Sequence, residues 1–236
     1  MTVEPPSWKY ADLCSKPATI DYALEMVKTY ATLGYGLIAM ETLPSGLKTV
    51  EDAARESGVR IVWRHTIRAS SSADVRRGLR NVPGPARLVA VAAMTLEAAR
   101  YAARSKQVDI LVIEPGMERL VDASTLELFT QRGWGAVEIH LSPLLRAFEG
   151  PDRRLEAMLR YLFVSMRRAT GYRVPLVVSS CAESKWELFH PMHILGLSSL
   201  AGIPEEEVLR WLTSVPAAIA SRRAGSYRGG TPGGGG

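Results

Sequence analysis

The chain has few cysteines and no long apolar segment. Its 236 residues include only two cysteines, Cys14 and Cys181, which excludes a four-cysteine zinc site and a network of several disulfides. No run approaches the roughly eighteen apolar residues that a membrane-spanning helix needs. The first nine residues carry two prolines and an acid, without the basic-then-apolar order of a signal peptide. We therefore expect a cytoplasmic protein without membrane contact.

Lysine is also scarce, although the chain is basic overall. Six lysines and 23 arginines make up the 29 basic residues, and the formal net charge is +5. Guanidinium groups form two-point hydrogen bonds to phosphate and stack on bases, so an arginine excess suits RNA contact. Nucleotide bias in a genome rich in G and C produces the same excess. Composition leaves both interpretations open.

Seven short apolar runs alternate with helical patterns. Most of these runs lack strict alternation, as is typical of parallel strands buried on both faces. The predicted strands are 9–13, 36–40, 60–67, 87–92, 110–113, 136–141 and 175–179. The predicted helices include 19–33, 95–104, 122–131 and 152–170, followed by two C-terminal ones, 191–200 and 204–222.

This alternation predicts an α/β fold with parallel crossovers. Short connections favour a TIM-like (βα) barrel of about seven parallel strands with extra C-terminal helices, in one domain over residues 1–223. A doubly wound sheet is the alternative. The Gly-rich residues 224–236 are expected to be a disordered tail.

The strand ends, where barrels carry their functional groups, show no catalytic motif. Metal-dependent barrels place His-x-His after the first strand, whereas residues 11–14 read Ala-Asp-Leu-Cys. Phosphate-binding glycine loops and a Gly-x-Ser-x-Gly motif are absent from the sequence. His190 and His193 lack the four-residue spacing of helical zinc ligands, and His65 and His140 suit the core. We expect no catalytic residue, metal ligand or cofactor in the chain itself.

The two cysteines follow the first and the last predicted strands. These strands become neighbours if the barrel closes, so a disulfide is geometrically conceivable. Disulfides are rare in the cytosol outside hyperthermophiles, and buried free thiols are the ordinary alternative. The sequence leaves the choice open.

The arginines follow a helical period in the longest predicted helix. Arg153, Arg160 and Arg167 are seven residues apart and share one stripe, and the apolar residues lie opposite. Arginines without acidic neighbours repel one another, which a phosphate partner or an acidic protein surface would relieve. A solvated basic face is the alternative. Arg76, Arg77 and Arg80 form a second, shorter cluster.

Several segments, in order, resemble the family of ribonuclease P protein component three. The motif residues are Tyr10-Ala11-Asp12-Leu13, Leu33-Gly34-Tyr35, Arg64, residues 108–113, His140-Leu141-Ser142-Pro143 with Arg153-Arg154, and Ser179-Ser180-Cys181-Ala182-Glu183 followed by Leu195-Gly196-Leu197. The similarity spans roughly residues 9–220. Cys181 departs from it, since smaller or non-thiol residues are common there in the family.

The resemblance implies a barrel subunit of ribonuclease P, which removes the 5′ leader from precursor tRNA. It implies that the RNA subunit performs a Mg²⁺-assisted hydrolysis, and that this chain binds that RNA and pairs with protein component two and other subunits. Asp12, Ser179, Ser180 and Glu183 are expected to be structural. The expected RNA contacts are Arg64, Arg68, Arg76, Arg80, Arg153, Arg154, Arg160 and Arg167.

Two other functions remain open at this point. Asp12, Glu41, Glu114 and Glu183 fall at predicted strand ends and suggest a metal-dependent phosphoesterase, because carboxylates bind divalent ions. The second alternative is a protein-interaction module whose arginines bind an acidic protein and not RNA.

Overall fold

The computed structural model describes residues 10–148 and 152–225, so most of the predicted tail, 226–236, lies outside the described residues. The strands are β1 Tyr10–Ser15, β2 Tyr35–Glu41, β3 Arg60–Ala69, β4 Leu88–Ala93, β5 Ile110–Ile113, β6 Ala136–His140 and β7 Leu176–Ser179. The helices between and after them are α1 Ile20–Thr32, α2 Leu47–Glu56, α3 Ser72–Arg80, α4 Leu96–Arg104, α5 Ala123–Arg132, α6 Ser142–Phe148, α7 Asp152–Gly171, α8 Pro191–Leu200, α9 Glu205–Leu212 and α10 Ser214–Gly225, with the short 3-10 helices η1 Glu118–Leu120 and η2 Lys185–Glu187.

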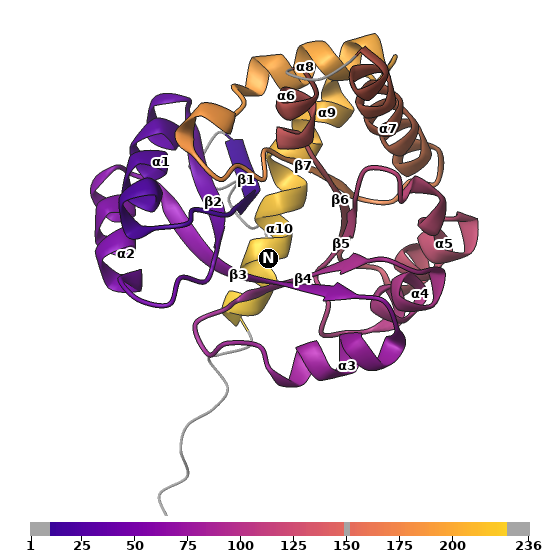
Figure 1. Cartoon of the computed structure of the whole chain (residues 1–236), viewed down its shortest axis with the longest axis horizontal. Helices are drawn as coiled ribbons and strands as arrows, with labels where there is room; N and C mark the ends of the chain where they lie inside the picture. Colours follow the sequence, from indigo (N-terminus) through magenta and orange to yellow (C-terminus); the bar gives the residue numbers. More distant parts are fainter. Residues whose placement is uncertain (1–9, 149–151, 226–236) are drawn as a thin grey trace, which may run out of the picture.

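The strands pair in parallel in the order of the chain, from β1 to β7. A doubly wound sheet requires a reversal of strand order, which this sequential order excludes. The strands form a ring with helices around its outside, and β7 returns to the side of β1 (Figure 1). The predicted TIM-like barrel of seven parallel strands is confirmed.

The barrel closes at the seam between β1 and β7 with few backbone contacts. One isolated parallel bridge joins Ser15 to Ala182, and the Lys16 amide donates to the Ala182 carbonyl at 2.7 Å. The amide of Leu13 donates to Ser179 Oγ at 3.2 Å, where a continuous ladder would place a carbonyl. Side chains therefore complete the closure that the backbone leaves unfinished.

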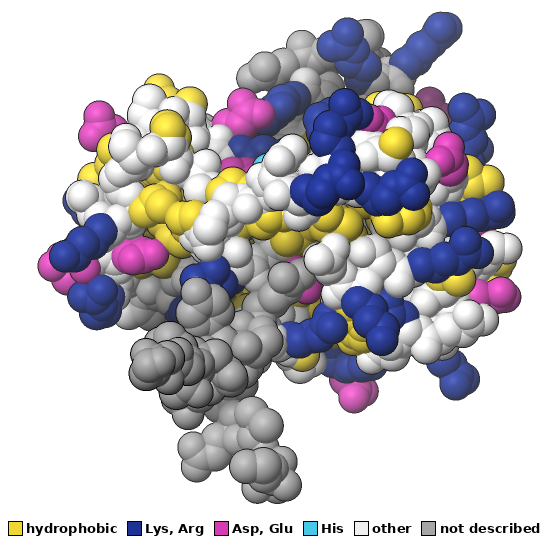
Figure 2. Space-filling model, turned by 90° about the horizontal axis from the view of Figure 1, so that it is seen from below, with side chains coloured by type: hydrophobic (Ala, Val, Ile, Leu, Met, Phe, Trp, Pro, Cys, Tyr) yellow, Lys and Arg dark blue, Asp and Glu magenta, His cyan; other side chains and the backbone are white. Residues whose placement is uncertain are grey.

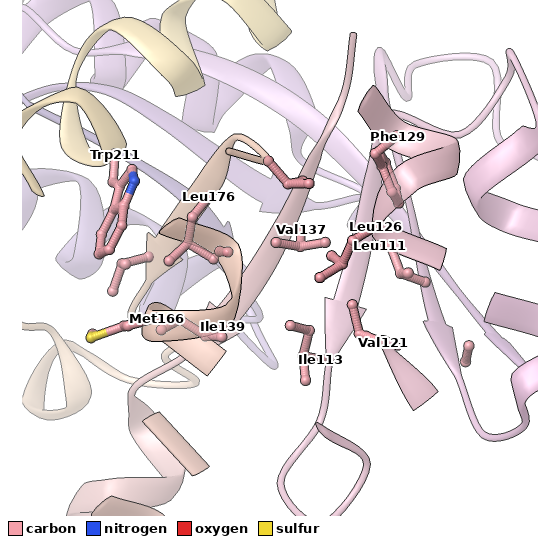
Figure 3. Packing of buried hydrophobic residues seen from close by; sticks show 14 of the residues in the cluster. Leu111, Ile113, Val121, Leu126, Phe129, Val137, Ile139, Met166, Leu176 and Trp211 are labelled. Carbon is pink, nitrogen blue, oxygen red and sulfur yellow. The ribbon is translucent and has the colours of Figure 1, made fainter. Parts of the chain in front are cut away.

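A large apolar core lies between the strands and the surrounding helices. Outward-facing side chains of β5, β6 and β7, such as Leu111, Ile139 and Leu176, lie among Phe129 of α5 and Met166 of α7 (Figure 3). Thr95 and Asp122 cap α4 and α5 with their side-chain oxygens. In the parts of the chain that the structure describes, no helix combines the length and hydropathy of a membrane span.

The last helix covers the amino-terminal end of the barrel. Val215, Ile219 and Ala220 of α10 pack with the inward-facing residues at the strand starts, including Leu88 and Ile110. The prediction of one helix over 204–222 is wrong, because α9 ends at Leu212 and α10 begins at Ser214. Pro216 explains the break, since its ring clashes with the carbonyl four residues earlier and offers no amide hydrogen. The carboxyl ends of the strands lie at the other end of the barrel, where TIM-like barrels carry their functional groups.

Candidate nucleic-acid interface

The carboxyl end of the barrel interior is filled by an ion pair across the strands. Arg64 of β3 has no exposed surface, and its Nη1 and Nη2 donate to Oε1 and Oε2 of Glu138 at 2.9 and 2.6 Å. Nη1 also donates to the Leu13 carbonyl at 2.5 Å, and Nε donates to Thr66 Oγ1 at 2.9 Å. The guanidinium is thus satisfied by the protein itself. Burial removes Arg64 from the expected set of RNA contacts.

Glu138 is the centre of this polar network, and it was not among the predicted site residues. Ser179 Oγ donates to its Oε1 at 2.7 Å, and His140 Nε2 lies 3.0 Å from its Oε2. Burial opposes ionisation of Glu138, but the charge of Arg64 and the contact with His140 lower its pKa to about 2. Burial lowers the pKa of His140, although the hydrogen bond and the charge of Glu138 oppose this effect.

Asp12 holds the seam of the barrel. Its Oδ2 accepts from the Ser180 amide at 3.0 Å and from Ser180 Oγ at 2.5 Å, and its Oδ1 accepts from the Cys14 amide at 3.0 Å. Burial raises the pKa of Asp12 to about 6, and the hydrogen bonds limit that rise. The positions of Asp12, Ser179 and Ser180 therefore suit the structural role expected of them.

The remaining motif residue, Glu183, lies apart from this network. Its side chain is exposed and forms an ion pair with Arg146 at 3.0 Å. Arg146 also pairs with Glu187 at 2.9 Å, so Glu183 helps fix the loop after β7 against α6.

The four acids of the phosphoesterase alternative do not converge on one point. Asp12 accepts hydrogen bonds at the seam, and Glu41 accepts hydrogen bonds from Thr66. Glu114 forms an ion pair with Arg68 at 2.9 Å, and Glu183 forms one with Arg146. In the described ranges, the single group of residues with ligand atoms close enough to share a metal ion is Cys14, His140 and Cys181. The acid set that motivated that alternative is therefore not assembled.

Among the described residues, the outer surface of α7 carries several exposed arginines with one exposed acid. The α7 arginine surface, as we define it, consists of Arg153, Arg154, Arg160, Arg167 and Arg168, all exposed. On the opposite face, Leu162 and Met166 are buried in the core. The predicted separation of a basic and an apolar face is confirmed, and Glu156 is the one exposed acid among the described side chains of this helix.

Two surface hollows flank this helix and are lined by arginines. A hollow of about 610 Å³ lies between η1 and α7, with Arg119, Arg160 and Arg168 at its walls. A second, of about 450 Å³, lies between α6 and α7, with Arg146, Arg153 and Arg154. Sequence reasoning missed Arg119 and Arg146 because they come from other elements and share no periodicity with α7. Guanidinium groups at a concave surface suit phosphate oxygens, although Arg146 is already paired with Glu183 and Glu187 and Glu118 also lines the first hollow.

The other predicted arginines lie elsewhere on the ring. Arg76 and Arg80 are exposed on α3, where Arg76 also lies 5.6 Å from the centre of the Tyr101 ring. The face of the molecule that carries α3 shows more Lys and Arg side chains than Asp and Glu (Figure 2). Arg68 is exposed, but its ion pair with Glu114 occupies part of its guanidinium. The structure thus separates two basic surfaces, on α7 and on α3.

The cysteines meet at the seam, as their positions after the first and last strands predict. Cys14 and Cys181 form a disulfide with a Cα–Cα distance of 4.4 Å. Cys181 adopts a left-handed backbone conformation with φ of 50°, which is uncommon for residues other than glycine. The turn directs the chain after β7 back toward β1.

Comparison with known proteins gives a consistent result. A family model described as RNase P subunit p30 matches residues 9–227. The chain is 33% identical to ribonuclease P protein component 3 of Aeropyrum pernix over 193 residues, which cover 82% of this chain and 88% of that protein. It is 25% identical to the protein of the same name from Methanothermobacter thermautotrophicus over 224 residues, 89% of this chain and 88% of that one.

Solved structures share the fold. A chain from the cryo-EM structure of archaeal ribonuclease P with mature tRNA has a TM-score of 0.70 at 16% identity, covering 96% of both chains. Ochratoxinase of A. niger has a TM-score of 0.58 at 10% identity, covering 90% of this chain and 71% of that one. At such identities, these likenesses concern the fold alone.

Proposed function

The chain belongs to the RNase P subunit p30 family, and from this membership we propose that it binds the catalytic RNA of ribonuclease P and supports endonucleolytic removal of the 5′ leader from precursor tRNA. The observation that carries the proposal is the family match over nearly the whole described chain. The exposed α7 arginine surface supports it, since phosphate contacts provide most of the affinity of such proteins.

We assign the hydrolysis to the RNA and its Mg²⁺ ions. The polar groups at the carboxyl end of the barrel satisfy one another, as the two-point contact between Arg64 and Glu138 illustrates. Asp12 is likewise hydrogen-bonded to Ser180 and buried. A catalytic carboxylate needs access to substrate or water, which these two acids lack.

We choose the arginines that contact RNA by the exposure of their side chains and by whether an acidic side chain already pairs with them. Arg153, Arg154, Arg160 and Arg167 are exposed on one helix and form the principal contact. The exposed arginines of α3, Arg76 and Arg80, form a second, smaller contact. We rank Arg68 below both, because binding phosphate there competes with Glu114. RNA shape, and not base sequence, is the expected determinant.

Protein partners complete the proposal. We propose that the chain pairs with ribonuclease P protein component 2 and joins other subunits in a cytoplasmic ribonucleoprotein. Precursor tRNA would then be contacted through the assembled particle. Support comes from the relative found in archaeal ribonuclease P with mature tRNA, a particle in which a chain of the same fold is present.

Precursor-tRNA cleavage by a cognate ribonuclease P RNA is the direct test. The assay compares RNA plus component 2 with and without this chain over a range of Mg²⁺ concentrations. We expect the chain to lower the Mg²⁺ requirement or raise the rate, and the proteins without RNA to cut nothing. Absence of any effect on a competent RNA would overturn the proposal, and cleavage by the protein alone would overturn the assignment of the chemistry to RNA.

A further inference from the structure

Three potential metal ligands meet at the seam of the barrel. Cys14 at the end of β1, His140 at the end of β6 and Cys181 after β7 place one ligand atom each within 4.8 Å of the others. His140 and Cys181 lie near each other because β6 pairs with β7, and closure of the barrel brings Cys14 to them. Thiolate sulfur and imidazole nitrogen are the ligands that zinc prefers in proteins.

His140 has one ring nitrogen in contact with a carboxylate and one left for a cation. Its Nε2 contacts Oε2 of Glu138 at 3.0 Å, which leaves Nδ1 as the other nitrogen that can bind a cation. Histidine ligands usually donate their second ring N–H to a carboxylate, which fixes the tautomer and the ring orientation. Glu138 is itself fixed by Arg64 and Ser179, so the imidazole has a rigid support.

The two cysteines are held at the same place by the backbone around them. The amide of Cys14 donates to Asp12, and the carbonyl of Cys181 accepts from Ser142 Oγ at 3.1 Å. Cys14 has no exposed surface, whereas Cys181 and His140 are 5% and 6% exposed. All three residues are therefore buried, and an ion bound there would be shielded from solvent.

We propose that the reduced chain binds one Zn²⁺ ion through the thiolates of Cys14 and Cys181 and the imidazole of His140. Binding releases the two thiol protons and leaves zinc divalent, so no electron transfer is involved. The disulfide and the zinc site exclude each other, because the sulfurs of a disulfide are not thiolates. Three protein ligands leave the fourth tetrahedral position to water or another small ligand. This ion is separate from the Mg²⁺ used by the RNA, and the inference does not depend on the proposed function.

Metal binding by the oxidised and the reduced full-length chain tests the proposal directly. The protein is stripped with a chelator, one half is reduced and transferred to an oxygen-free buffer, and Co²⁺ is added as a spectroscopic probe, followed by Zn²⁺. We expect the reduced chain to bind one ion with a thiolate-to-cobalt absorption band that Zn²⁺ abolishes. The oxidised chain should bind none. Equal behaviour of the two forms would overturn the proposal.

Histidine variants test whether His140 is a metal ligand or whether the two cysteines bind the ion without it. His140→Asn should weaken Zn²⁺ binding by about ten-fold or more, the smallest loss expected when a group that orients a metal site is removed. His193→Asn, an exposed histidine on α8, is the matched control and should leave affinity unchanged. Equal affinity of both variants would remove His140 from the site. Cys181→Ala gives a second check if Cys14→Ala fails to fold, because loss of one thiolate should weaken both the cobalt band and the affinity for Zn²⁺.

Discussion

Arg64 of β3 and Glu138 of β6 meet across the barrel interior in a fully buried two-point ion pair, with Nη2 and Oε2 2.6 Å apart. The pair occupies the place where a barrel enzyme would keep an open, reactive site. Because each charge is desolvated, its energetic role is best measured by removing one partner or both.

Arg64→Met should destabilise the protein by about 3–5 kcal/mol, because it leaves the Glu138 carboxylate buried without its partner. Urea denaturation measures the free energy of unfolding. The double variant Arg64→Met with Glu138→Leu should be less destabilised than the sum of the single variants, since no buried charge remains. Additive losses in this cycle would mean that the two side chains contribute independently.

Arg153→Ala combined with Arg160→Ala should weaken RNA binding and reduce the salt dependence of binding by about one unit of slope for each phosphate that is no longer neutralised. Filter binding or fluorescence at several salt concentrations gives the slope. The charge-matched control is Lys28→Ala with Arg55→Ala, which removes two exposed cations from α1 and α2, across the ring from α7 (Figure 1). If both double variants changed the slope equally, the effect would reflect net charge and not the α7 arginine surface.

Asp12 should make stability depend on pH in the mildly acidic range. Its folded-state pKa is raised from 3.8 to about 6 by burial, so the folded state holds the proton more tightly than the unfolded state. The stabilisation is therefore full below about pH 4 and is lost as pH rises through about 6. Unfolding free energies of wild type and Asp12→Asn, measured from pH 4 to 7, should differ in slope within this window. Parallel curves would show that the Asp12 pKa is not raised.

Reduction of the disulfide between Cys14 and Cys181 should lower the free energy of unfolding by about 2–4 kcal/mol. The bond joins residues separated by 167 positions and ties the seam, so it restrains the unfolded chain over most of its length. Denaturation with and without reductant, in metal-free buffer, measures the difference. Cys14→Ala with Cys181→Ala should be insensitive to reductant, and two free thiols in the unfolded, unreduced wild type would contradict the bond.

Local patterns in the sequence were sufficient to predict much of the structure. The apolar runs predicted all seven strands to within a few residues, and the seven-residue spacing of Arg153, Arg160 and Arg167 predicted the exposed face of α7. The same order of strands predicted that Cys14 and Cys181 would be neighbours. These features depend on residues close together in sequence, or on the order of the elements alone.

The sequence by itself therefore determined the barrel, the basic face of its longest helix and the proximity of the cysteines. Only the tertiary structure decided that Arg64 is an internal group, that Glu138 pairs with it, and that His140 joins the two cysteines at the seam. In one dimension a buried arginine and an exposed one look alike. Their difference arises when two residues 74 positions apart, on β3 and β6, face each other inside the closed barrel and their charges are desolvated.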